Sequence, residues 1–198
     1  MMLCFVESGW VVMGGKIRII GGSWRGRKFP IPDVEGLRPT PDRVRETLFN
    51  WLMPVLGGAR CLDLYAGSGA LGLEAASRGA DRVVMVDRDH GVVRQLRHNI
   101  DTLKSDRVSV VQADALAYLE RVEQPFDIVF LDPPFRQELV AECCQRLESG
   151  GWLTANAHIY LELERELGEP QLPKGWSLLR SKVAGQVGYH LATRQAGE

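Results

Sequence analysis

The sequence lacks the features that mark several large classes of protein. Its four cysteines form no CxxC pair and its four histidines show no metal-ligand spacing, so we expect buried, reduced thiols and no metal. No apolar run approaches the length of about 20 residues that a membrane-spanning helix needs. The formal net charge is −1, which by itself gives no argument for nucleic acid. No surplus apolar helix stands out, so these absences indicate a cytoplasmic, monomeric protein with no membrane segment.

The 198 residues that are present suffice for one ordinary domain with a short appendage. We expect residues 1–15 to be a loose N-terminus. Their apolar stretch lacks the basic n-region and the A-x-A cleavage site of a signal peptide. Met13 could be the initiator in place of Met1.

Basic residues concentrate near the N-terminus. Residues 16–20 and 27–31 flank the glycine-rich turn Gly-Gly-Ser-Trp-Arg-Gly and together predict a small β-hairpin, with no acidic residue between Gly14 and Pro32. The charge is compatible with a phosphate-binding arm for RNA and equally with an edge hairpin that is protected by its charges, and it does not by itself favour the RNA arm. The candidate RNA-binding residues are Lys16, Arg18, Arg25, Arg27 and Lys28.

An amphipathic pattern follows the segment Leu-Arg-Pro-Thr-Pro at residues 37–41. Thr40 is a suitable N-cap with Pro41 at the first helical position, and Pro54 is expected to end the helix after about Leu52. Arg43 and Arg45 on this helix either face RNA or lie in solvent, and the sequence does not choose between the two.

From Arg60 onward, predicted strands alternate with predicted helices. Strands are expected over residues 61–65, 82–87, 108–112, 126–131 and 159–164, with helices over 71–78, 92–103, 116–121 and 138–147. Residues 176–183 and 187–193 form two more strands with a short turn between them. The pattern predicts an α/β, Rossmann-like fold: a mostly parallel, seven-stranded sheet with a C-terminal antiparallel hairpin.

A glycine loop joins the first of these strands to the first helix. Its sequence Gly67-Ser-Gly69-Ala-Leu-Gly72 also satisfies the dinucleotide fingerprint G-x-G-x-x-G, so a nicotinamide or flavin oxidoreductase is an alternative. Asp63 favours S-adenosylmethionine instead, because its carboxylate can receive an ammonium group, whereas a pyrophosphate would gain nothing from that charge. The reverse hairpin at the C-terminus is also unusual for dehydrogenases.

Two further carboxylates follow the next strands. Asp87 can accept hydrogen bonds from ribose hydroxyls, and Asp114 can accept one from an adenine amine, although Asp114 alone is equally suited to capping a helix. The candidate cofactor-binding residues in these segments are Asp63, Tyr65, Ala66, Gly67, Ser68, Gly69, Asp87, Arg88, Asp114 and Ala115.

The segment Asp132-Pro133-Pro134-Phe135 follows the fourth strand, at the edge where open α/β sheets bind ligands. An exocyclic base amine is a poor nucleophile, and a carboxylate with a proline carbonyl can accept its two N–H bonds. Phe135 can stack on the base. The alternative is a rigid strand exit with Phe135 in the core. We predict that these four residues are catalytic and act by positioning and electrostatics.

These motifs, in this order, resemble class I methyltransferases, whose (N/D)-P-P-(Y/F/W) motif marks amino-group targets. More narrowly, the chain is similar to RsmD-type methyltransferases, which modify a guanine N2 of small-subunit (16S) ribosomal RNA. The resemblance is carried by RIIGGSWRGRK (18–28), LRPTPDRVRETLFNWL (37–52), LDLYAGSGALGLEA (62–75), DPPF (132–135) and KVAGQVGY (182–189).

The resemblance implies S-adenosylmethionine as cofactor and an assembled or assembling small ribosomal subunit as partner. Residues 16–36 would be an RNA-facing arm and residues 37–198 the methyltransferase domain. Arg38 and Thr40, with Phe49 and Asn50, resemble a segment that closes over the cofactor, although Phe49 is also a natural core residue. The alternatives are a DNA or protein amino-group methyltransferase, an NAD(P)-dependent oxidoreductase and a non-catalytic ribosome-assembly factor.

Overall fold

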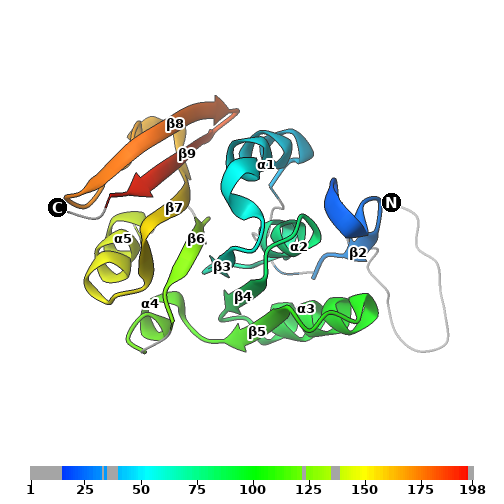
Figure 1. Cartoon of the computed structure of the whole chain (residues 1–198). Coiled ribbons are helices and arrows are strands. Elements are labelled where there is room, and N and C mark those ends of the chain that lie inside the picture. Colours follow the sequence, from blue (N-terminus) through cyan, green and yellow to red (C-terminus); the bar gives the residue numbers. More distant parts are fainter. Residues whose placement is uncertain (1–14, 33, 35–39, 122–123, 135–138, 196–198) are drawn as a thin grey trace.

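A seven-stranded sheet forms the centre of the molecule (Figure 1). The structure is a computed structural model, and it describes residues 15–32, 34, 40–121, 124–134 and 139–195. The strand order is β5-β4-β3-β6-β7-β9-β8. The strands are β3 (Arg60–Asp63), β4 (Arg82–Asp87), β5 (Val108–Gln112), β6 (Phe126–Leu131), β7 (Leu153–Glu164), β8 (Trp176–Ala184) and β9 (Val187–Arg194). The first five are parallel, and β9 pairs antiparallel with both β7 and β8, which confirms the predicted fold class.

Helices cover both faces of the sheet (Figure 1). The helices are α1 (Asp42–Leu56), α2 (Ala70–Ser77), α3 (His90–Leu103), α4 (Ala115–Tyr118) and α5 (Leu139–Ser149). The first three share one hydrophobic core with alternate residues of β6, Ile128 and Phe130, while α4 and α5 share the other core with Val129 and Leu131. Burial on both faces explains why β6 is apolar at every position except Asp127.

The basic N-terminal segment folds as a short hairpin beside this core. Strands β1 (Lys16–Arg18) and β2 (Lys28–Pro30) pair antiparallel, and the turn between them contains a 3₁₀ helix, η1 (Gly22–Trp24). The strands are shorter than predicted, and at the turn the Ile20 N–H donates to Glu74 Oε2 at 2.8 Å instead of across the hairpin. Ile17, Ile19 and Phe29 are buried in the same core as α1 and α2.

Helix α1 differs from its prediction at both ends. Pro41, with an extended backbone, is the N-cap, and Thr40 makes no capping hydrogen bond. Pro54 lies inside the helix, which continues to Leu56. A proline cannot donate to the carbonyl four residues earlier. That carbonyl belongs to the exposed Asn50, where water can satisfy it.

Candidate active site

The sheet has one topological switch point, between β3 and β6. From β3 the chain moves outward through β4 to β5, and it then returns to place β6 and β7 on the other side of β3. Open α/β sheets bind their ligands at the carboxyl ends of the strands at such a point. The glycine loop leaves β3 here, and Asp132, Pro133 and Pro134 leave β6.

The glycine loop is held in one conformation by hydrogen bonds that its backbone N–H groups donate. The Ala66 N–H donates to the Val86 carbonyl at 2.9 Å, and the Gly67 N–H donates to Asp87 Oδ2 at 2.9 Å. Gly69 has a φ of +78°, and a Cβ there would lie 2.6 Å from a methyl carbon of Leu96. Only glycine meets both demands. Gly69 therefore lets the start of α2 pack closely against Leu96 of α3.

Asp63, the last residue of β3, is buried with half of its hydrogen-bonding capacity unused. Oδ2 accepts the Gly72 N–H at 3.0 Å, whereas Oδ1 is buried without a hydrogen-bond partner. Burial, with the nearby Asp87 charge, raises the pKa of Asp63 to about 7. A buried, unpaired carboxylate oxygen is costly unless a partner arrives. This oxygen suits a ligand that carries an ammonium group.

The pKa of Asp63 predicts a pH-dependent stability for the protein without cofactor. Between about pH 4 and 7 the folded protein holds a proton that the unfolded chain has lost, so the free energy of unfolding falls as the pH rises through this window. Asp63→Asn is expected to remove about 3 kcal/mol of the fall between pH 5 and pH 8, since the two pH units between 5 and the pKa of about 7 correspond to about 1.4 kcal/mol each. Urea unfolding at pH 5 and pH 8 measures it.

The exposed Asp106→Asn, which removes the same charge from a loop, is the matched control for this measurement. It should show the pH dependence of the wild type. Equal pH dependence in Asp63→Asn and the wild type would contradict the ionisation assigned to Asp63.

The other predicted cofactor residues lie along the same edge. Asp87 is half-buried, and its Oδ1 accepts the Asp89 N–H at 2.9 Å. Asp114 is exposed and caps α4, accepting the N–H groups of Leu116 and Ala117 at 3.0 and 3.2 Å. The structure thus places Asp114 as a cap, and its contact with adenine stays a prediction.

The remaining predicted residues differ in accessibility. Arg88 is exposed, whereas Ala66, Ser68 and Ala115 are buried. Tyr65 is half-buried, and its hydroxyl lies 3.3 Å from Cys143 Sγ. Cys61, Cys143 and Cys144 are buried free thiols, as predicted for these three.

Three carboxyl groups end adjacent strands at the switch point, and we call them the carboxyl row: Asp63, Asp132 and Glu162. Asp63 ends β3, Asp132 directly follows β6, and Glu162 lies near the end of β7. Burial raises the pKa of Asp132 well above its ordinary value, and the charges of Glu162 and Asp63 raise it further. The Thr40 hydroxyl is within hydrogen-bonding reach of both Asp132 and Glu162 and lowers the pKa of each. Thr40 therefore belongs to this site rather than to the cap of α1.

Glu162 is a site residue that the sequence analysis missed. It is 4% exposed, and the Tyr160 hydroxyl donates to its Oε1 at 2.7 Å. The available signal was a charged residue inside the apolar run Ile159–Leu163, in a strand that is buried on both faces. Such a residue needs a partner or a function.

The Asp-Pro-Pro-Phe segment is described only in part. Pro133 is buried and Pro134 exposed, while Phe135 and Arg38 lie outside the described residues. Phe49 is fully buried, with its ring centroid 6.1 Å from that of Phe130, so the structure places it in the core.

The basic hairpin carries its five predicted cations on an exposed surface. Arg18 pairs with Asp42 at 3.1 Å, at the start of α1. Both alternatives for Arg45 are wrong: it is 1% exposed and lies between Asp42, at 2.6 Å, and Glu74, at 3.5 Å. Arg43 is exposed.

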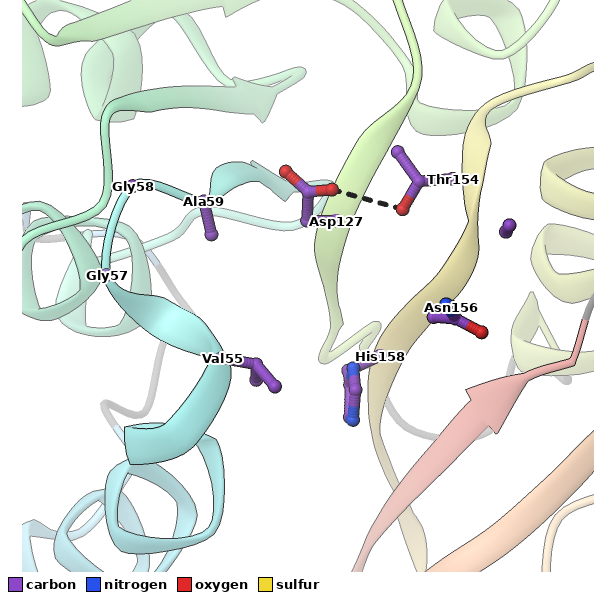
Figure 2. Close-up of a pocket in the computed structure, with 9 residues that line it drawn as sticks. Val55, Gly57, Gly58, Ala59, Asp127, Thr154, Asn156 and His158 are labelled. Atoms are coloured by element: carbon purple, nitrogen blue, oxygen red, sulfur yellow. Dashed lines mark hydrogen bonds between the residues drawn. The ribbon is translucent and has the colours of Figure 1, made fainter.

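A cavity of about 510 Å³ lies at the other edge of the sheet, near the amino ends of β3, β6 and β7 (Figure 2). Asp127 lines it, but its two oxygens already accept the Arg60 N–H at 2.9 Å and the Thr154 hydroxyl at 3.1 Å. The Asp127 carboxylate thus links β6 to β3 and β7. The chemistry-bearing residues gather at the opposite edge.

Comparisons with known proteins agree with this geometry. A family described as "Conserved hypothetical protein 95" matches residues 17–193. Ribosomal RNA small subunit methyltransferase D of Escherichia coli K12 is 56% identical over 182 residues, which are 92% of each chain. The methyltransferase D of Haemophilus influenzae is 48% identical, over 89% of this chain and 93% of its own. The chain belongs to this RsmD family of methyltransferases.

Solved structures extend the similarity to three dimensions. The structure of the E. coli protein yhhF is 53% identical, covers 92% of this chain and 100% of its own, and superposes with a TM-score of 0.87. Membership of the RsmD family decides between the two interpretations of the glycine loop in favour of a methyltransferase.

The described residues contain neither a membrane-spanning helix nor a group of side chains that could hold a metal ion. No helix among them is long and apolar enough to cross a membrane. Within the same residues, no group of three or more His, Cys, Asp or Glu side chains is arranged to hold a metal ion.

Proposed function

We propose that this chain transfers a methyl group from S-adenosylmethionine to the exocyclic N2 amine of a guanine in 16S ribosomal RNA. The observation that carries the proposal is the position of Asp132 and its two prolines beside Asp63 and the glycine loop, at the switch point of the sheet. A carboxylate at the end of β6 faces a site that is built to bind a charged ligand. The similarity to methyltransferase D supports the ribosomal substrate.

The residues of this edge fit S-adenosylmethionine. Asp63 Oδ1, buried and unpartnered, would receive the ammonium group. Asp87 would accept hydrogen bonds from the ribose hydroxyls, because each of its oxygens retains a free lone pair beside its backbone contact. When bound, the cofactor supplies a methyl group on a positively charged sulfur, which leaves as a thioether with the electron pair of the broken bond.

The chain's own groups prepare the amine. Asp132 and a proline carbonyl would accept its two N–H bonds, which favours a pyramidal nitrogen with an available lone pair. Pro133 and Pro134 have no N–H of their own, so their carbonyls face no competing donor from these residues. Phe135 would stack on the base and hold it for attack. Positioning and electrostatics would then supply the rate gain.

The wider context completes the proposal. The partner would be the assembled or assembling small subunit in the cytoplasm, and the enzyme would act as a monomer. The basic hairpin would bind RNA phosphates, which gives affinity without sequence information. Extruding the target base is expected to cost a few kcal/mol.

A methylation assay tests the function directly. Small ribosomal subunits that lack native methylation are incubated with labelled S-adenosylmethionine, and the digested RNA is analysed by nucleoside mass spectrometry. N2-methylguanosine is the expected product. A different methylated base would overturn the target, and no incorporation into subunits would overturn the substrate class.

Charge on the hairpin should set RNA affinity and its salt dependence. Replacing Arg25, Arg27 and Lys28 by alanine is expected to weaken subunit binding and to reduce the slope of log K against log salt by about 2–3, because each lost phosphate contact removes about 0.7–0.9. Binding measured across a salt series checks it.

A matched triple variant controls for net charge. Arg121, Lys174 and Arg180 are exposed cations around α4 and β8, across the sheet from the hairpin (Figure 1). Their replacement should leave the slope unchanged. Equal slopes for the hairpin variant and the wild type would show that the hairpin does not contact phosphate.

A further inference from the structure

Glu162 carries a buried charge next to the residue that would accept the target amine. Leu131 of β6 pairs with Leu161 of β7, so the next residues along both strands, Asp132 and Glu162, come out side by side. The charge of Glu162 raises the pKa of Asp132 more than the charge of Asp63 does. The fold thus brings a second carboxyl group to the one that faces the substrate.

Two hydroxyl groups fix the position of Glu162. The Tyr160 hydroxyl donates to Oε1 at 2.7 Å, and the Thr40 hydroxyl hydrogen-bonds to the carboxyl group as well. Hydrogen bonds donated to a carboxyl group favour its ionised form. They oppose the burial that raises the pKa of Glu162 to about 7. Glu162 is therefore a carboxylate above about pH 7.

The described residues around Asp132 and Glu162 include further acidic and aromatic groups. Asp132 comes from β6, Asp63 from β3, and Tyr189 of β9 pairs with Glu162 in the sheet register. Tyr189 stacks on Trp51 of α1, at 5.6 Å between ring centroids, and Lys182 of β8 lies over the Trp51 ring. In the described part of the chain, neither arginine nor lysine lowers the pKa of Asp132 or Glu162.

A like charge disfavours the ionised form of its neighbour. Asp132 beside an ionised Glu162 thus binds a proton more tightly than an isolated aspartate. A carboxylate that binds a proton near neutral pH is a better proton acceptor than one with an ordinary pKa. Thr40, which has one hydroxyl hydrogen, can donate to only one of the two carboxyl groups at a time.

We propose that Glu162 is a positioning residue for proton transfer: its carboxylate, fixed by Tyr160 and Thr40, makes Asp132 the base that takes the proton from the target amine. The inference rests on the proposed amine methylation. As the nitrogen forms its bond to the methyl group, one N–H bond breaks and its electron pair stays on nitrogen. The proton goes to Asp132, which loses its negative charge, and then to solvent at this half-buried residue.

The pH dependence of single-turnover methyl transfer tests this role with Glu162→Gln. Glutamine can still accept the Tyr160 hydrogen bond but carries no charge. The maximal rate is expected to fall about tenfold, because Asp132 becomes a weaker base. The pH of half-maximal rate is expected to move down by about one to two units. Glu162→Asp, which keeps the charge, should move that pH less. A lower rate at an unchanged half-maximal pH in Glu162→Gln would overturn the proposal.

A titration of the free protein separates this inference from the proposed function. Carboxyl ¹³C NMR of protein without cofactor or RNA should show Asp132 ionising at lower pH in Glu162→Gln than in the wild type. Tyr160→Phe, which leaves Glu162 in place, should move the ionisation of Glu162 to higher pH. Unchanged titrations in both variants would refute the coupling even if methyl transfer proceeds. Shifted titrations would support it even if the RNA substrate proves different.

Discussion

Replacing Asp132 by alanine is expected to lower the rate of methyl transfer by about 10²–10⁴-fold, the contribution of a well-placed proton acceptor. Cofactor affinity should stay within the same order of magnitude, because the ammonium group is assigned to Asp63 and not to Asp132. Single-turnover methyl transfer measures the rate, and equilibrium titration with S-adenosylmethionine measures the affinity.

The control is Asp106→Ala, which removes a carboxylate from an exposed loop away from the carboxyl row. It should leave both quantities unchanged. Asp132→Asn adds a sharper comparison, since an amide oxygen can accept an N–H bond but cannot take a proton near neutral pH. Its rate is expected to lie between those of the wild type and Asp132→Ala. Loss of cofactor binding together with activity would make Asp132 a structural residue.

The fold could be predicted from the sequence because each strand is recognisable from a short run of neighbouring residues. The predicted bounds of β4, β5 and β6 match the structure, since each is a short apolar run with polar residues around it. Helix α1 was predicted wrongly at its start because the Thr40 hydroxyl bonds to Asp132 and Glu162, which are remote in the sequence. A capping rule weighs only neighbouring residues and cannot see such competition.

The residues of the candidate site also differ in whether their position depends on local sequence or on tertiary contacts. Asp63 could be predicted because it directly precedes a glycine loop, whose geometry is a local property. Glu162 could not, because its role depends on β7 lying next to β6 and on Thr40 reaching both strands. Arg45 was missed for the same reason: its partner Glu74 lies on another helix. Buried charges are satisfied by tertiary contacts, so the sequence reveals them only as charged residues in apolar surroundings.

Glu74 is the second site where a large effect is expected, and it anchors the basic hairpin. Its buried carboxylate accepts the N–H groups of Ile20 and Gly21, each at 2.8 Å, and pairs with Arg78 at 2.6 Å and Arg45 at 3.5 Å. The hairpin approaches α2 so closely that a Cβ at Gly22 would overlap the Ser77 carbonyl. The hairpin is therefore docked by buried polar contacts as well as by its apolar side chains.

Glu74→Ala is expected to lower the free energy of unfolding by about 3–5 kcal/mol, because it removes the carboxylate that pairs with Arg78 and leaves the Ile20 and Gly21 N–H groups without their acceptor. Urea unfolding measures the loss, with the exposed Glu46→Ala on α1 as a control that should cost no more than about 0.5 kcal/mol. Similar costs for the two variants would contradict the anchoring role of Glu74.

The double variant Arg45→Met with Glu74→Leu separates stability from docking. Removing both buried charges should recover part of the loss, since apolar replacements of a buried ion pair are often neutral. The Ile20 and Gly21 N–H groups would still lack their acceptor, so hydrogen exchange at these two amides should remain faster than in the wild type. Because α2 begins at the glycine loop, the anchor also sets how far the hairpin cations lie from the methyl-transfer site. The double variant should therefore bind the subunit more weakly than the wild type does, while its cofactor affinity is kept. A double variant with wild-type subunit affinity would show that the hairpin needs no anchor to bind RNA.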